Sequence, residues 1–358
     1  MRVKLEEVCK RIYAGGDVPK DRYSEEKTED YKVPIFANAE KDEGLYGYTD
    51  EAREKELSIT VAARGTIGYT VIRREPFLPV VRLITVVPDL EKVSERYLFY
   101  ALKMCKPQSS GTSIPQLTVP DIKKNTLNLL DIAEQESIAN RLDKLNGIIK
   151  LRTEVISKMD ELIRARFVEM FVSKNYPREE LDNLSYGKGE YGAQSASVEY
   201  NSSRPRYVRI TDIKEDGSLN DDVVCSANVE DDKLYKLKYG DFCFARMGAT
   251  VGKTYAYRGG NQIFAGYLIR YKLNLNRIIP EYLYEFTRLH EYRNWVSLNQ
   301  SGAAQPGINA KKYGSLRIPV APLEEQRVFA KFVEEVNKSK VVFHHVTQIH
   351  IYKTSTLL

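Results

Sequence analysis

The chain has 358 residues, of which 42% are hydrophobic and 29% charged, and its net charge of +5 is too small to indicate a nucleic-acid-binding protein by itself. It contains no run of 18 apolar residues and no apolar leader, so we expect a cytoplasmic protein without a membrane span or a signal peptide. The four cysteines include no C-x-x-C pair, which predicts buried or free thiols rather than a zinc site or a disulfide framework.

The first domain is predicted over 1–130, and its charge is unevenly distributed. Residues 17–56 are rich in Asp and Glu, whereas residues 64–124 carry an excess of Lys and Arg. Runs of β-branched and aromatic residues bounded by Gly or Pro predict strands over 56–72 and 76–87. An acidic and a basic flank in one domain fit a protein that orients itself on a polyanion, and they fit two solvated faces equally well.

A long amphipathic helix is predicted over 133–171, inside a spacer segment that we place at 131–172. Its apolar residues recur at alternating spacings of four and three, which is typical of a helix that packs along a seam. Asp131 followed by Glu134 predicts a capping box at its start. The first residues of the seam are Ile138, Leu142, Leu145 and Ile149.

The second domain is predicted over 173–320, with strands at 206–213, 241–248 and 253–273. A second helix and a tail are predicted over 321–358. This helix carries Phe329, Val333 and Val336 on one face. An amphipathic helix must bury its apolar stripe, so we predict that the two long helices pack antiparallel. The last fifteen residues lose the stripe, which predicts that the second helix ends early or changes there.

The second half of the chain repeats the first with a register of 191 residues. This register carries Leu117 onto Ile308 and Glu134-Gln135 onto Glu325-Gln326. Upstream, RYLFYAL matches EYLYEFT and ARGTIG matches ARMGATVG, in the same order. A period this long predicts two similar domains rather than a solenoid. The expected fold class is therefore α+β, with two similar globular domains separated by two long antiparallel helices and an approximate internal twofold symmetry.

No catalytic motif is found in the sequence. The segment RMGATVGKTYAY is similar to a P-loop, but three residues separate Gly248 from Gly252 where that loop needs four, and the following residues predict a strand. An acid-acid-lysine nuclease site at Asp89, Asp121 and Lys123 has no counterpart in the second half. The Asn/Asp-Pro-Pro-aromatic loop of an amino-methyltransferase is also missing. We therefore expect no catalytic residue, no cofactor and no metal site in this chain.

The duplicated pattern resembles the specificity subunits of type I restriction–modification enzymes, over essentially the whole chain. The shared features are a glycine, spaced Ile and Leu residues, and then Glu-Gln at the head of a long helix. The matching residues are Gly111, Ile114, Leu117, Leu127 and Glu134-Gln135 in the first half, and Gly302, Ile308, Ile318, Pro319, Pro322 and Glu325-Gln326 in the second.

The resemblance implies a non-catalytic subunit of a DNA adenine methyltransferase and endonuclease complex. Each globular domain would be a target-recognition domain that reads one part of a bipartite, asymmetric site in double-stranded DNA. The helices would set the gap between the two parts and dock two methyltransferase subunits, to which motor-nuclease subunits can be added. S-adenosylmethionine, ATP and magnesium would belong to these partners.

The candidate DNA contacts are basic residues, most of which recur at corresponding, loop-like places in both halves. Lys and Arg position a protein on phosphates, and Arg also reads base edges. The candidates are Arg64, Lys123, Lys124, Arg206, Arg209, Arg246, Lys253, Lys311 and Lys312. The alternative function, from another class, is a two-domain RNA-binding or assembly adaptor without sequence-specific DNA reading.

Overall fold

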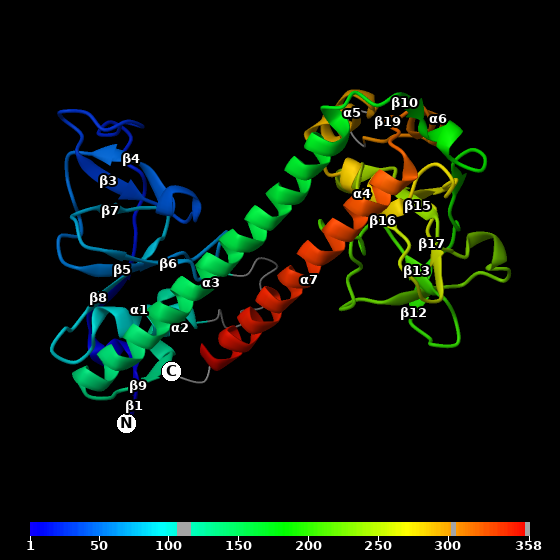
Figure 1. Cartoon of the computed structure of the whole chain (residues 1–358). Helices are drawn as coiled ribbons and strands as arrows, with labels where there is room; N and C mark the ends of the chain where they lie inside the picture. Colours follow the sequence, from blue (N-terminus) through cyan, green and yellow to red (C-terminus); the bar gives the residue numbers. More distant parts are fainter. Residues whose placement is uncertain (106–115, 302–305, 355–358) are drawn as a thin grey trace. The chain divides into compact units, whose positions relative to one another are not determined.

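The computed structural model describes residues 1–105, 116–301 and 306–340, together with the helical backbone of 341–354 (Figure 1). The chain forms two compact units: unit 1 contains 1–152 and 345–358, and unit 2 contains 153–344. Both boundaries fall inside long helices, so each helix contributes to both units. Among the described residues, no helix combines the length and the apolar composition that a membrane span requires. Gly111, Ile114 and Gly302 of the duplicated pattern lie outside the described residues.

Unit 1 is built on a four-stranded antiparallel sheet in the order β2-β8-β5-β6. The strands are β2 (Cys9–Ala14), β8 (Ile84–Pro88), β5 (Ser58–Val61) and β6 (Thr70–Arg73). All residues of β5 and β8 are buried, because helix α1 (Glu95–Lys103) packs on the sheet and contributes Tyr97 and Leu98 to the same hydrophobic core. The strands predicted over 56–72 and 76–87 correspond to β5, β6, β7 (Leu78–Pro79) and β8.

Two smaller groups of strands complete unit 1. A three-stranded sheet in the order β4-β3-β7 contains β4 (Leu45–Thr49) and β3 (Val33–Phe36). The first strand of the chain, β1 (Arg2–Lys4), pairs antiparallel with β9 (Thr126–Asn128), which follows helix α2 (Val119–Lys124). The domain therefore begins and ends at one pair of strands.

Unit 2 repeats this plan with a four-stranded antiparallel sheet in the order β11-β18-β15-β16. The strands are β11 (Glu190–Tyr191), β18 (Leu268–Lys272), β15 (Asp241–Ala245) and β16 (Thr254–Ala256). Its helices are α4 (Pro280–Phe286), α5 (His290–Asn299) and α6 (Ala310–Gly314). The first and last strands, β10 (Arg178–Glu180) and β19 (Arg317–Pro319), again pair antiparallel. The remaining strands are β12 (Ser197–Glu199) paired with β14 (Cys225–Ala227), and β13 (Arg206–Val208) paired parallel with β17 (Gln262–Phe264).

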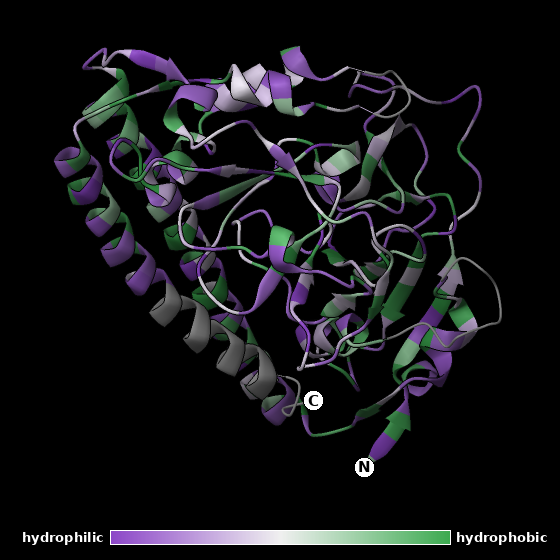
Figure 2. Ribbon diagram, turned by 90° about the vertical axis from the view of Figure 1, so that its right-hand side faces the viewer, coloured by the Kyte–Doolittle hydropathy of each residue, from purple (hydrophilic) through white to green (hydrophobic). Residues whose placement is uncertain are grey.

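The two long helices are α3 (Ile132–Phe167), which a π-turn continues over Val168–Val172, and α7 (Leu323–Thr354). Both hydrophilic and hydrophobic residues lie on the long helices where Figure 2 colours them. Within unit 2 they run antiparallel, since Lys340 of α7 pairs with Asp160 of α3 at 2.8 Å and the rings of Phe329 and Phe167 lie 5.4 Å apart. Of the two alternatives predicted for the last fifteen residues, an early end of the second helix is wrong, because α7 continues to Thr354. The stretch 344–354 contains no Gly or Pro, and main-chain helical bonding does not require a heptad stripe.

The mixed α+β class with two similar domains and two long helices is confirmed. The cysteine prediction is confirmed too, because all four thiols are free and three of them are buried. The segment after Gly252 is strand β16, as its sequence predicts, so a helix that would complete a P-loop does not follow it. Among the residues that the structure describes, no group of His, Cys, Asp or Glu is arranged to hold a metal ion.

Candidate nucleic-acid interface

The β5–β6 loop of unit 1 and the β15–β16 loop of unit 2 share one main-chain frame but differ in length. Ala62 N donates to Tyr69 O at 2.8 Å and Gly68 N to Ala62 O at 2.9 Å. The same pair of bonds recurs in unit 2, from Ala245 N to Lys253 O at 2.8 Å and from Gly252 N to Ala245 O at 3.0 Å. The second loop therefore holds one additional residue between the same two anchors.

This insertion changes which basic residues correspond. Leu117 N donates to Ala63 O at 3.0 Å, and its counterpart Ile308 N donates to Arg246 O at 2.9 Å. Arg246 therefore occupies the position of Ala63, whereas the sequence match pairs it with Arg64. Since successive side chains along an extended backbone point to opposite faces, this shift of one residue places the two arginines in different surroundings.

Arg64 and Arg246 are each placed by a neighbouring side chain. The exposed Arg64 donates through Nε to Gln116 Oε1 at 2.8 Å. Arg246 lies over the Tyr191 ring, 4.9 Å from its centroid, and its main-chain N–H donates to Tyr267 O. Tyr191 and Tyr267 are both largely exposed. A cation stacked on the exposed Tyr191 ring, with the exposed Tyr267 nearby, is an arrangement suited to nucleotide bases and phosphates.

The paired lysines lie in short helices and not in the loops that the sequence suggests. Lys123 and Lys124 form the last turn of α2, which Thr118 caps by accepting from Asp121 N. Lys311 and Lys312 lie in α6, which Asn309 caps by accepting from Lys312 N. The two caps are 191 residues apart, so the two helices correspond, but the lysines do not: Lys123 and Lys124 lie five and six residues after their cap, and Lys311 and Lys312 two and three residues after theirs. Lys312 Nζ donates to Asn299 O at 2.7 Å, at the end of α5.

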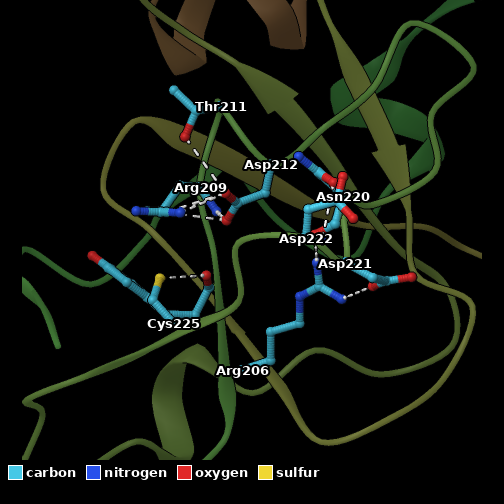
Figure 3. A network of polar contacts seen from close by, with 9 residues as sticks. Arg206, Arg209, Thr211, Asp212, Asn220, Asp221, Asp222 and Cys225 are labelled. Carbon is cyan, nitrogen blue, oxygen red and sulfur yellow. Dashed lines mark hydrogen bonds and ion pairs between the residues drawn. The ribbon is translucent and has the colours of Figure 1, made fainter. Parts of the chain in front are cut away.

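Arg206 and Arg209 are engaged inside their own domain (Figure 3). Arg206 pairs with Asp221 at 2.6 Å and donates to Asn220 O, and its side chain is 15% exposed. Arg209 makes a forked contact with the buried carboxylate of Asp212, which also accepts the Arg209 main-chain N–H. These hydrogen bonds raise the pKa of Arg209. Both guanidinium groups therefore stabilise the segment between β13 and β14.

Lys253 lies at the end of the β15–β16 loop and points into a cavity of about 410 Å³ in unit 2. Its Nζ forms an ion pair with Glu215 at 2.7 Å. The same cavity is lined by Lys214, Arg288 and Arg293, which the sequence does not single out. They come from separate segments, so no spacing in the sequence relates them.

The predicted seam residues of the long helices belong to two different cores. Phe329 and Val333 of α7 pack with Ile163, Phe167 and Phe171 in the core of unit 2, and Val336 packs against this core. On α3, Ile138 packs against the core of unit 1. Leu142 is fully buried, whereas Leu145 and Ile149 are half-buried. The α3 partners of Phe329 therefore lie near the C-terminal end of α3, beyond the four residues that the prediction names.

Comparison with known proteins gives consistent matches. The family model of the type I restriction modification DNA specificity domain matches residues 1–159 and 187–350. Over 142 residues, or 40% of this chain, the sequence is 41% and 39% identical to two putative type I specificity subunits of Mycoplasma pneumoniae. These matches span about two fifths of the relatives, 42% and 39% of their lengths.

Solved structures give the same fold. The S subunit of a type I restriction–modification system from M. genitalium aligns over 100% of this chain and 94% of its own, with a TM-score of 0.53 and 14% identity. A chain from a structural study of complex assembly and conformational transition of the type I R-M system aligns over the same shares, with a TM-score of 0.57 and 14% identity. At this identity the likeness concerns the fold alone.

Proposed function

This chain belongs to the type I restriction–modification DNA specificity family, and from that membership we propose that its two domains read the two parts of a bipartite, asymmetric target in double-stranded DNA. In this proposal the long helices set the gap between the parts and dock two methyltransferase subunits. Motor-nuclease subunits join the same core. The cofactors S-adenosylmethionine, ATP and magnesium are bound by these partner subunits, and the assembly works in the cytoplasm.

One observation carries the proposal: the two domains share a main-chain frame but carry different surfaces on it. The two four-stranded sheets have the same strand order, and each domain closes through a pair formed by its first and last strands. The surroundings differ, because unit 1 adds the three-stranded sheet β4-β3-β7 where unit 2 adds two separate strand pairs. A shared frame supports similar docking on DNA, and different loops and side chains support reading different bases.

The experiment is a gel shift of the full chain, alone and with its methyltransferase subunits, on duplex DNA and on structured RNA. We expect sequence-selective retardation of duplex DNA by the complex, and methylated adenine at one bipartite motif when host DNA is sequenced at single-molecule level. Selective retardation of RNA, with no preference among duplexes, would favour the RNA-binding adaptor and contradict the proposal.

A further inference from the structure

The cavity of about 410 Å³ in unit 2 gathers positive charge from four segments of the chain. Lys214 comes from the segment after β13, Lys253 from the β15–β16 loop, Arg288 from the turn after α4, and Arg293 from α5. Glu215 contributes the one carboxylate of the lining. Among the described residues, no carboxylate forms an ion pair with Lys214 or Arg293 across the cavity, although Lys214 interacts electrostatically with the neighbouring Asp216. The lining is therefore strongly cationic, and two of its charges have no ion pair across it.

The carboxylate in this cavity is weakly held. Glu215 pairs with Lys253, but its side chain is 88% exposed. An exposed ion pair of this kind contributes little to stability, so a competing anion displaces the carboxylate at little cost. Lys253 is more firmly placed, because its Nζ also lies 3.4 Å from Ile213 O and its side chain is 26% exposed.

The arginine at the floor of the cavity is fixed in orientation before any ligand arrives. Arg288 Nη1 donates to Tyr284 Oη at 2.8 Å and to Glu215 O at 3.1 Å. On its other side, Nη2 lies 3.7 Å from Asp160 of α3, and Asp160 also binds Lys340 of α7. Its Nε also lies 3.9 Å from Glu285, so the donors of Arg288 are engaged within the domain and it contributes a positive charge at a fixed position in the lining.

The shape of the loop completes the site. The lining also includes the buried Thr254 and Thr287, whose hydroxyls lie 2.9 Å apart, and Thr287 donates to Tyr284 O at 2.7 Å, so both hydroxyls are satisfied within the domain. Gly252, with φ +86°, allows the β15–β16 loop to lie directly against α5, because a Cβ there would meet the Val296 side chain at 2.9 Å. Lys253 is thereby brought to the same cavity as Arg293 of α5.

We propose that this cavity binds a backbone phosphate of the DNA target beside the β15–β16 loop. The inference rests on the proposed function and adds a binding site to it. A concave site with a fixed guanidinium, an adjoining lysine and two further cations at its rim fits a compact oxyanion on a polyanionic chain. The site fixes the position of the second domain on the duplex and leaves base reading to other side chains.

The test is fluorescence anisotropy of the full chain on duplex DNA over a range of salt concentrations. The double variant Lys214→Gln/Arg293→Gln removes the two rim charges, which make no ion pair across the cavity in the described part of the chain. We expect the slope of log K against log[salt] to fall by about 2, with equal loss of affinity for target and scrambled duplexes. Glu215→Gln should strengthen binding, because it releases Lys253. A matched control is Lys331→Gln, an exposed lysine of α7 outside the cavity, which should leave the slope unchanged.

The outcomes separate this inference from the proposed function. If the unmodified chain does not bind duplex DNA, alone or with its methyltransferase subunits, the proposed function fails. If it binds and the double variant keeps its slope, the cavity is not a DNA site and only this inference is overturned. A further arm uses inorganic phosphate: if phosphate raises the Tm of the unmodified chain but not of the double variant, while the duplex slopes agree, the cavity serves a free phosphate compound instead.

Discussion

Gln135 and Gln326, 191 residues apart, make the same three hydrogen bonds at the heads of α3 and α7. Both side chains are fully buried. In each, Oε1 accepts a main-chain N–H just before the first helix of the sheet domain, and Nε2 donates to two carbonyls. The partners are Ser94 N, Lys92 O and Leu130 O for Gln135, and Ile279 N, Arg277 O and Ala321 O for Gln326. Each glutamine thus ties the start of a long helix to its sheet domain.

We expect Gln326→Glu to destabilise unit 2 by several kcal/mol at neutral pH, because a carboxylate would face the Arg277 and Ala321 carbonyl oxygens without a proton to donate. Burial would raise the pKa of the new carboxyl, so its neutral form would be favoured in the folded state. Stability should therefore be partly restored below about pH 4 and lost as pH rises. Thermal unfolding at several pH values measures this. Glu324→Gln, at an exposed position two residues earlier, should stay within about 0.5 kcal/mol of the unmodified chain.

The helix pair in unit 2 can be tested at Phe329. Its ring packs edge-on against Phe167 and Phe171 at 5.4 Å each. We expect Phe329→Ala to cost about 3–5 kcal/mol, since it opens a cavity in a closely packed aromatic cluster. Val328→Ala changes the exposed neighbour and should have little effect. Equal unfolding midpoints for the two variants in urea would contradict the packing. Leu145→Asp is a weaker test, because Leu145 is only half-buried.

Glu285 makes the stability of unit 2 depend on pH. The pKa of this carboxyl is raised to about 7, mainly by burial and also by the nearby Asp160. Arg288, Lys340 and Arg258 oppose this shift because their positive charges lower the pKa. The raised pKa favours the neutral acid in the folded state. Its contribution is therefore fully present below about pH 4.5, falls as pH rises, and is lost above about pH 7.

We expect Glu285→Gln to remove this dependence, of about 3 kcal/mol between pH 4 and pH 8, because the amide stays neutral. Urea unfolding at pH 5 and pH 8 measures it. The control is Glu281→Gln on the same helix, an exposed position that should preserve the pH dependence. An unchanged pH dependence in the Glu285 variant would show that another group is responsible.

The two half-sites should be exchangeable one at a time. Replacing residues 173–320 with the corresponding domain of a relative carries both β10 and β19, which pair with each other, and should change one half-site only. Exchanging only residues 175–310 would pair the β10 of the relative with the native β19, and we expect this chimeric protein to be less stable. Methylome sequencing reads the outcome. Simultaneous change of both half-sites would contradict the modular reading.

The helices should act on the gap alone. Adding four residues, about one turn, within the middle of α3 keeps the side-chain faces of the helix nearly in phase. We expect methylome sequencing to show an altered gap with both half-sites unchanged. Loss of methylation altogether would be expected only if docking of the methyltransferase subunits were disrupted, which co-purification of those subunits detects.

The sequence predicts those features of the fold that leave a regular spacing of residues along the chain. The stripe of α3 and the 191-residue register identify the helices, the duplicated domains and the Glu-Gln heads. The relation of Arg64 to Arg246 could not be predicted from the sequence. The two arginines align in the sequence motif, but one residue inserted in the second loop makes Arg246 correspond to Ala63 in the structure. Lys214, Arg288 and Arg293, which line one cavity with Lys253, escape detection because they meet only in space. The engagement of Arg209 by Asp212 was foreseeable, since acid and base lie three residues apart.

The closing strand pair of unit 2 also has a mechanical consequence. The chain enters the domain at Arg178 and leaves it at Pro319, and these residues are partners at the same end of the β10–β19 ladder. The bond from Val320 N to Pro177 O, at 2.9 Å, lies at that end too. A force that pulls the entering and leaving segments apart would therefore act on the hydrogen bonds of this ladder one after another. It would not load all of them at the same time. Bonds that are loaded one at a time resist less force than bonds loaded together, so we expect this strand pair to be an early point of opening when the two chain segments are pulled apart.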